Sequence, residues 1–127
     1  MTKNFLIVED DPTARVLIRK VLEESTIEIG TVYEAENGEE GLKALDKYNI
    51  DVMLVDIYMP VMDGIEMLDY ARDHPEHKNI PAIVISMEND EKRIEAIIRK
   101  GFGFVHKPFT KDLLKDEIVK LTGKQDG

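Results

Sequence analysis

The sequence predicts an α/β protein, a single doubly wound (βα)5 domain with a five-stranded parallel sheet and helices on both faces. Five short apolar runs alternate strictly with stretches whose apolar residues recur at helical spacing. Parallel strands require such crossover connections, so strict alternation is typical of a parallel sheet covered on both sides. A length of 127 residues fits one domain with a buried core.

The first strand is expected at 5–8, before the acidic sequence at 9–11. A helix is expected to begin at Pro12, because proline suits the first helical position and Asp11 can cap the free backbone amides. Its predicted apolar face consists of Ala14, Leu17, Ile18, Val21 and Leu22.

The second strand is expected at 27–35, where apolar and polar residues alternate, and the Asn-Gly pair at 37–38 separates it from a helix running to about Tyr48. The third strand, 52–55, is a continuous apolar run, as expected for a strand buried on both faces, and it delivers Asp56 to its carboxyl end.

A third helix follows and is predicted to end at the His-Pro step, 74–75, because a residue before proline avoids helical geometry. The fourth strand is expected at 81–86 and the fifth at 104–106. Between them, Asp90 can cap a helix that stops at Gly101. The predicted inner faces are Ile65, Leu68 and Ala71 on the third helix, Ile94, Ile97 and Ile98 on the fourth, and Leu114, Ile118 and Leu121 on a fifth that starts at Thr110.

Composition excludes several classes of function. With 26 acidic and 17 basic residues the net charge is −9, which argues against a nucleic-acid surface, since such binding depends on Lys and Arg. The chain has no cysteine, no signal-peptide pattern and no apolar stretch long enough to span a membrane. We therefore expect a cytoplasmic protein.

Polar residues at the carboxyl ends of four expected strands indicate a site. Glu9 and Asp10 follow the first strand, Asp56 the third, Ser86 ends the fourth and Lys107 follows the fifth. In open α/β sheets the carboxyl ends of the strands form the ligand-binding crevice.

The chemistry of this set favours a hard cation and a phosphoryl group. Two carboxylates about 4 Å apart repel by roughly 4 kcal/mol at an effective dielectric near 20, so three acids together require a positive charge. Oxygen ligands suit Mg²⁺, or Mn²⁺ in its place. An aspartate beside a metal, an ammonium and a hydroxyl is equipped as a nucleophile that forms an aspartyl phosphate.

These residues resemble a response-regulator receiver domain of two-component signalling, in the CheY-like superfamily, over essentially the whole chain from Phe5 to about Leu121. The motifs that carry the resemblance are Glu9-Asp10 after Leu-Ile-Val, the DIYMPVMDG sequence from Asp56, Ser86 after the fourth strand, and Phe104 three residues before Lys107-Pro108-Phe109.

The resemblance implies a strand order of 2-1-3-4-5. It also implies that Asp56 is a phosphoacceptor that receives a phosphoryl group from a histidine kinase or a histidine phosphotransfer protein. It implies Mg²⁺ bound by Asp10, Asp56 and the backbone carbonyl of Tyr58, with Glu9 acting through a water. The domain would be no conventional enzyme, although it would promote its own phosphorylation and dephosphorylation.

The resemblance also implies that Ser86 and Lys107 contact the phosphoryl oxygens, that Ser86 and Phe104 form the switch pair, and that the Lys107–Pro108 bond is cis. Phosphorylation would then change the surface made by the fourth helix, fifth strand and fifth helix. A downstream protein or an output domain would read that surface, with the chain a monomer or a phosphorylation-dependent homodimer.

Three residues depart from the family pattern. Glu9 stands where aspartate is more frequent, Phe102 replaces a usual alanine, and Met87 follows Ser86 where a small residue is usual. With Tyr58, Met87 could shield the phosphoryl site from water, so we predict a slowly hydrolysing phosphoaspartate.

Several alternatives stay open. The chain could be a degenerate receiver that only docks partners, or a receiver cut from a longer protein with a DNA-binding or enzymatic output domain. A dehalogenase-like phosphatase would need a second acid at Tyr58, and a flavin or nucleotide carrier would need a Gly-, Ser- and Thr-rich loop at 9–11.

We predict that residues 1–122 form the receiver domain and 123–127 a polar tail. The three histidines, His74, His77 and His106, are expected on the solvated surface without forming a ligand cluster.

Overall fold

The computed structural model describes residues 2–123, which form one five-stranded parallel sheet between two layers of helices. The strand order is β2-β1-β3-β4-β5, which confirms the predicted topology. The strands are β1 (Lys3–Val8), β2 (Ile29–Ala35), β3 (Val52–Val55), β4 (Ala82–Ser86) and β5 (Gly103–His106). The helices are α1 (Pro12–Glu24), α2 (Gly38–Lys47), α3 (Gly64–Asp73), α4 (Glu91–Arg99) and α5 (Lys111–Gly123).

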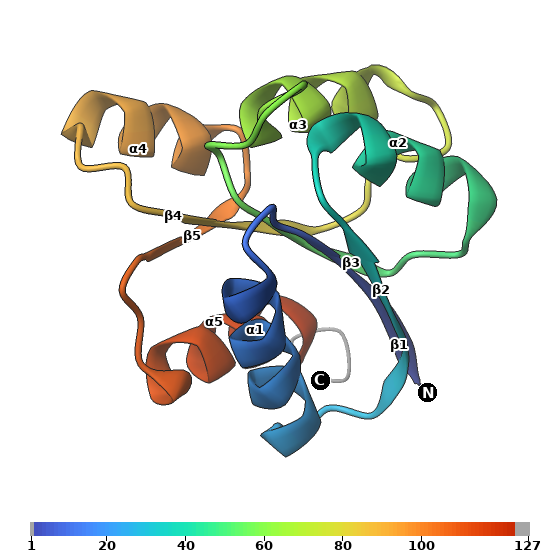
Figure 1. Cartoon of the computed structure of the whole chain (residues 1–127), viewed down its shortest axis with the longest axis vertical. Helices are drawn as coiled ribbons and strands as arrows, with labels where there is room; N and C mark the ends of the chain where they lie inside the picture. The colour runs from blue at the N-terminus through green and yellow to red at the C-terminus, as the bar shows by residue number, and fades with distance from the viewer. Residues whose placement is uncertain (1, 124–127) are drawn as a thin grey trace.

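The two helical layers bury different faces of the sheet. Figure 1 shows α1 and α5 on one face and α2, α3 and α4 on the other. Successive side chains along a strand point to opposite faces of the sheet and so pack into different cores. Leu6 and Met53 pack toward α2 and α3, whereas Ile7 and Leu54 pack toward α1 and α5. The continuous apolar runs seen in the sequence follow from this burial on both faces.

Side-chain caps begin all five helices at residues that the sequence offers for this purpose. At α5 the hydroxyl of Thr110 accepts from the backbone amide of Leu113. Asp11 accepts from the backbone amide of Thr13, Asn37 from Glu40, Asp63 from Glu66 and Asp90 from Lys92. Each cap satisfies a backbone donor that has no partner within its helix. The caps therefore set where the loops at the carboxyl edge of the sheet end.

Two predicted core residues are exposed instead. Leu17 on α1 is 51% exposed and Ile98 on α4 is 54% exposed, whereas their neighbours Ile18 and Ile97 are buried. Both helices carry an apolar stripe wider than the strip that contacts the sheet, so residues at its margin reach solvent.

The remaining corrections are small. β1 begins at Lys3, two residues before the predicted start, and β2 begins at Ile29, two residues after it. β4 begins one residue later than predicted and β5 one residue earlier. α5 extends through Gly123, so of the predicted tail only 124–127 lies outside the described residues. Within 2–123, no helix has the length and apolarity needed to cross a membrane.

Candidate acidic phosphoacceptor site

Four strand ends bring the predicted site residues to one edge of the sheet. Asp56 directly follows β3, the central strand, and its backbone amide donates to the carbonyl of Val8 at the end of β1 (2.9 Å). Glu9 directly follows β1, and Lys107 follows β5, where its amide donates to the carbonyl of Ser86 at 2.8 Å. Pairing between parallel strands thus aligns residues that are far apart in the chain.

The three acids form one cluster. A carboxylate oxygen from each of Glu9, Asp10 and Asp56 lies within 4.8 Å of the others. Glu9 is 2% exposed and Asp56 is 7% exposed, whereas Asp10 is exposed at the rim. Water therefore screens the repulsion between the two buried carboxylates poorly.

Lys107 supplies the positive charge that the cluster requires. Its ammonium nitrogen lies 2.5 Å from Oε1 of Glu9 and 3.7 Å from Oδ1 of Asp56. The Lys107–Pro108 peptide bond is cis, as the family resemblance predicted. The ammonium is closer to Glu9, so Asp56 is the less completely paired of the two buried acids.

The electrostatics make Asp56 a proton acceptor near neutrality. Burial and then the nearby charge of Glu9 raise the pKa of the Asp56 carboxyl to about 7, against the opposing effect of Lys107. Burial acts to lower the pKa of Lys107, but its hydrogen bond with Glu9 and the charge of Asp56 outweigh it and raise that pKa. Lys107 thus stays charged while Asp56 titrates.

The oxygen ligands offered by the three acids fit a divalent hard cation. A cation held by these carboxylates would relieve the repulsion that raises the pKa of Asp56. Glu9 already uses both oxygens within the protein, since Oε1 accepts from Lys107 and Oε2 accepts from the Asp11 amide at 3.2 Å. Asp10 and Asp56 are consequently the acids most available to an ion.

The two predicted switch residues, Ser86 and Phe104, contact groups other than the three acids. Ser86 is fully buried, and its hydroxyl oxygen accepts from the backbone amide of Glu88 at 3.1 Å. Phe104 on β5 is partly buried against the core under α2, α3 and α4. The switch roles of both residues stay predictions.

Glu88 is a residue that sequence reasoning missed. Its side chain is buried, accepts a hydrogen bond from the hydroxyl of Tyr58 (2.6 Å) and lies 3.3 Å from Arg93. Its other oxygen accepts from the amides of residues 89 and 90, which form the approach to α4. Glu88 thus connects the loop after Asp56 to the loop after Ser86, a link that no local pattern could reveal.

Arg15 and Gly64 also support the site without being predicted to do so. Arg15 on α1 donates to the backbone carbonyl of Glu9 at 2.6 Å and to Glu34 at 2.9 Å. A Cβ at Gly64 would lie 2.0 Å from the backbone oxygen of Asp56, so the start of α3 can approach Asp56 only with glycine there. The signal in the sequence was the Asp-Gly pair at 63–64, which ends the DIYMPVMDG motif.

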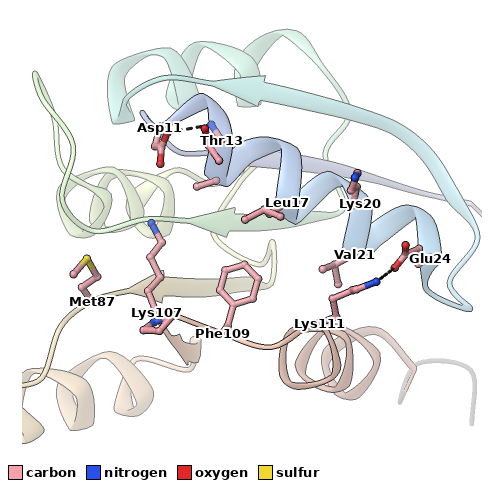
Figure 2. Close-up of a pocket in the computed structure, with 12 residues that line it drawn as sticks. Asp11, Thr13, Leu17, Lys20, Val21, Glu24, Met87, Lys107, Phe109 and Lys111 are labelled. Atoms are coloured by element: carbon pink, nitrogen blue, oxygen red, sulfur yellow. Dashed lines mark hydrogen bonds and ion pairs between the residues drawn. The ribbon is translucent and has the colours of Figure 1, made fainter.

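Phe102 and Met87, the two remaining residues that depart from the family pattern, lie in different surroundings. Phe102 is buried in the core, and the guanidinium of Arg72 lies over its ring at 4.4 Å. Met87 is 66% exposed and lines a cavity of about 590 Å³ beside the site. Figure 2 shows this cavity between α1 and the segment joining β5 to α5, with Leu17 and Phe109 among its apolar walls and Lys107 at one end.

The expectation for the histidines was wrong for two of them. His77 is 7% exposed, its Nε2 lies 3.0 Å from Oδ1 of Asp46, and its ring stacks on that of His74. Together these three residues form a second group of metal-ligand side chains. The fold of the turn after α3 against α2 creates this group, and sequence spacing alone did not indicate it.

This doubly wound fold, with its acids and lysine at the carboxyl edge, defines a signalling receiver domain. Residues 5–119 match the family model described as response regulator receiver domain. The chain belongs to this family and is CheY-like.

Named relatives agree with this assignment. The chain is 34% identical over 118 residues to the chemotaxis protein CheY of Halobacterium salinarum, covering 93% of this chain and 95% of that protein. It is 36% identical over 124 residues to the transcriptional regulatory protein BtsR of Escherichia coli, but spans only 50% of that protein's length. A solved receiver domain of a signal transduction histidine kinase from Syntrophus aciditrophicus superposes with a TM-score of 0.84 at 26% identity, covering 97% of this chain and 92% of that one.

Proposed function

We propose that the chain is a phosphoacceptor switch in which Asp56 takes a phosphoryl group from a phosphohistidine of a kinase or phosphotransfer protein. The observation that carries this proposal is a buried aspartate at the end of the central strand, 3.7 Å from the ammonium of Lys107 and within a cluster of three carboxylates. A purely structural role would leave such clustered charge without a purpose.

In the proposed step an oxygen of the ionised Asp56 carboxylate attacks phosphorus. A phosphorus–oxygen bond forms, the phosphorus–nitrogen bond of the donor breaks, and the departing imidazole keeps the electron pair and takes up a proton. The product is an acyl phosphate on Asp56. Lys107, already between Glu9 and Asp56, would move its ammonium onto a phosphoryl oxygen.

Asp10, Asp56 and the backbone carbonyl of Tyr58 would hold Mg²⁺, with Glu9 acting through a water and Mn²⁺ as the alternative ion. When bound, Mg²⁺ neutralises the carboxylates and the charge that develops on the phosphoryl oxygens. The exposed position of Asp10 leaves that side of the cluster open to an ion.

The proposed switch starts at Ser86. Its hydroxyl accepts from the Glu88 amide, so turning toward a phosphoryl oxygen would break that bond and free the loop before α4. Phe104, which is only partly buried, would then turn inward. The surface formed by α4, β5 and α5 would change as a result and be read by a partner protein.

We also propose that the phosphodonor protein docks in the cavity beside the site. The cavity is largely apolar, and Lys107, which contacts the acceptor, is one of its wall residues. The exposed Leu17 faces this cavity, so an apolar side chain on the donor would find a matching surface next to Asp56 (Figure 2).

The test is the intact mass of the protein after incubation with a small-molecule phosphodonor and Mg²⁺. We expect the gain of one phosphoryl group, lost in Asp56→Asn and in the presence of a chelator. Asp116→Asn, an exposed aspartate on α5, is the matched control and should still gain the group. Absence of any gain in the wild-type protein would favour a receiver that acts by docking alone.

A further inference from the structure

A second cluster of metal-ligand side chains lies where α2 and α3 end. Asp46 is the second-last residue of α2, His74 caps the carboxyl end of α3, and His77 lies in the turn that follows. A ligand atom from each lies within 4.8 Å of the others. Figure 1 shows α2 and α3 on the same face of the sheet.

This cluster is separate from the acidic site. The crossover helices run antiparallel to the strands, so α2 and α3 begin near the carboxyl edge of the sheet, where Asp56 lies, and end at the opposite edge. One ion therefore cannot serve both groups.

The turn after α3 holds His77 in a defined position. The backbone amides of His77 and Lys78 donate to the carbonyl of His74 (3.1 and 2.9 Å), and Arg72 donates to the carbonyls of Lys78 and Ile80 (2.7 and 3.1 Å). His77 is 7% exposed, and its ring stacks on that of His74 with centroids 4.1 Å apart. A buried imidazole in a braced turn is a preorganised ligand.

The ligand chemistry differs from that of the acidic site. Two imidazoles and one carboxylate suit Zn²⁺, Ni²⁺ or Cu²⁺, whereas Mg²⁺ prefers oxygen ligands alone. His77 Nε2 lies 3.0 Å from Oδ1 of Asp46, which is close to the separation of adjacent ligands that each lie about 2.1 Å from one ion. The ion would take the place of hydrogen between these two atoms, and the neutral imidazole of His77 would then carry its proton on Nδ1.

The helix dipoles favour a cation here, whereas the orientation of His74 has a cost. The carboxyl ends of α2 and α3 carry the negative ends of their helix dipoles, and both lie at this cluster. The ring of His74 is nearly parallel to that of His77, at 17°, so it must rotate to direct a nitrogen at a shared ion. Rotation would cost one hydrogen bond, from the amide of Glu76 to Nδ1 of His74, and the side chain has space at the surface.

We propose that Asp46, His74 and His77 bind one divalent ion of the zinc and nickel class, with water completing its coordination, and that this ion ties the end of α2 to the end of α3. The site is independent of phosphoryl transfer at Asp56.

The test is calorimetric titration with ZnCl₂ in excess Mg²⁺, which occupies the oxygen-only site. We expect one ion per chain. His74→Gln should weaken binding at least about tenfold, since it removes a ligand, while leaving the buried His77 and the fold in place. His106→Gln, which changes the histidine paired with Asn89 on the far side of the domain, is the matched control and should leave the affinity unchanged.

Asp46→Asn provides a second variant at an exposed position and should also weaken Zn²⁺ binding. Wild-type protein with saturating Zn²⁺ should melt at a higher temperature, by several degrees, and His74→Gln should not. Equal affinity in wild type and His74→Gln, or no binding at millimolar Zn²⁺, would overturn the proposal. So would NMR perturbations by Zn²⁺ that appear at Asp10 and Asp56 rather than at the two imidazoles.

Discussion

At the scale of single residues, one lysine shared by two buried acids gives Asp56 and Glu9 different electrostatic surroundings. Glu9 has both oxygens engaged, by Lys107 and by the amide of Asp11. Asp56 is nearly as buried but lies 3.7 Å from the same ammonium, so its charge is less well compensated. A buried carboxylate with incomplete pairing is a strong ligand for a cation and a strong nucleophile.

The raised pKa of Asp56 predicts a pH-dependent stability for the metal-free protein. Between the unfolded value of 3.8 and the folded value of about 7, the folded chain holds one proton more than the unfolded chain. The contribution of Asp56 to the free energy of unfolding therefore falls as pH rises through this window, by at most about 4 kcal/mol. In EDTA, Asp56→Asn should be more stable than wild type at pH 8, and the difference should shrink toward pH 4.

Urea unfolding at several pH values measures this difference directly. Asp116→Asn should track the wild type throughout, because that aspartate is exposed. An advantage of Asp56→Asn that stays constant from pH 4 to pH 8 would contradict the account, because it would not follow the titration of Asp56.

Two side chains near Asp56, the proposed acceptor, lead us to expect a long-lived phosphoaspartate. Tyr58 is tied to Glu88 by its hydroxyl, and Met87 stands exposed beside Lys107 in the cavity wall. We expect Met87→Ala and Tyr58→Ala to shorten the lifetime of the phosphorylated protein several-fold by admitting water, measured as the decay of the phosphorylated mass. Tyr70→Ala, an exposed tyrosine on α3, is the control, and a lifetime that barely changes in Met87→Ala would count against shielding.

At the scale of elements, adjacent residues on one helix have opposite roles. Leu114 of α5 is fully buried against the sheet, whereas Leu113 is 58% exposed. The same contrast on α1 separates the buried Ile18 from Leu17 at the cavity. The inner face of each helix stabilises the fold, and its margin remains available for docking.

This contrast predicts unequal effects of the same substitution on α5. Leu114→Ala should lower the free energy of unfolding by roughly 2 to 5 kcal/mol, because it removes buried methyl groups and leaves a cavity. Leu113→Ala should change it by less than about 0.5 kcal/mol. Chemical denaturation of both variants tests the helix orientation, and similar losses would show that α5 packs differently.

At the scale of the whole molecule, a site at one edge of the sheet is coupled to the stability of the entire domain. β3 lies at the centre of the sheet and ends in Asp56, while β1 and β5 deliver Glu9 and Lys107. Folding is therefore required to assemble the acids, and any ion that binds only the assembled site stabilises the whole fold.

We accordingly expect Mg²⁺ to raise the melting temperature, and to raise it more at pH 8 than at pH 5. At acidic pH the proton on Asp56 competes with the ion, because the pKa of this carboxyl is raised. A free Mg²⁺ concentration about 100 times the dissociation constant would add roughly 2.7 kcal/mol of stability. Thermal melts with Mg²⁺ and with EDTA measure the effect, and an equal rise in Asp56→Asn would place the ion elsewhere.

The sequence alone predicted the succession of elements, the doubly wound class and the acids and lysine at the strand ends, because helical spacing, apolar runs and capping residues are local signals. Its resemblance to receiver domains supplied the strand order and the cis bond. The tertiary structure alone decided which margins of the helices stay exposed, and it brought Glu88 to Tyr58, Arg15 to Glu9 and His77 to Asp46. Each of these contacts joins elements or loops whose relative placement depends on how helices pack on the sheet, and no periodicity within a single segment encodes that placement.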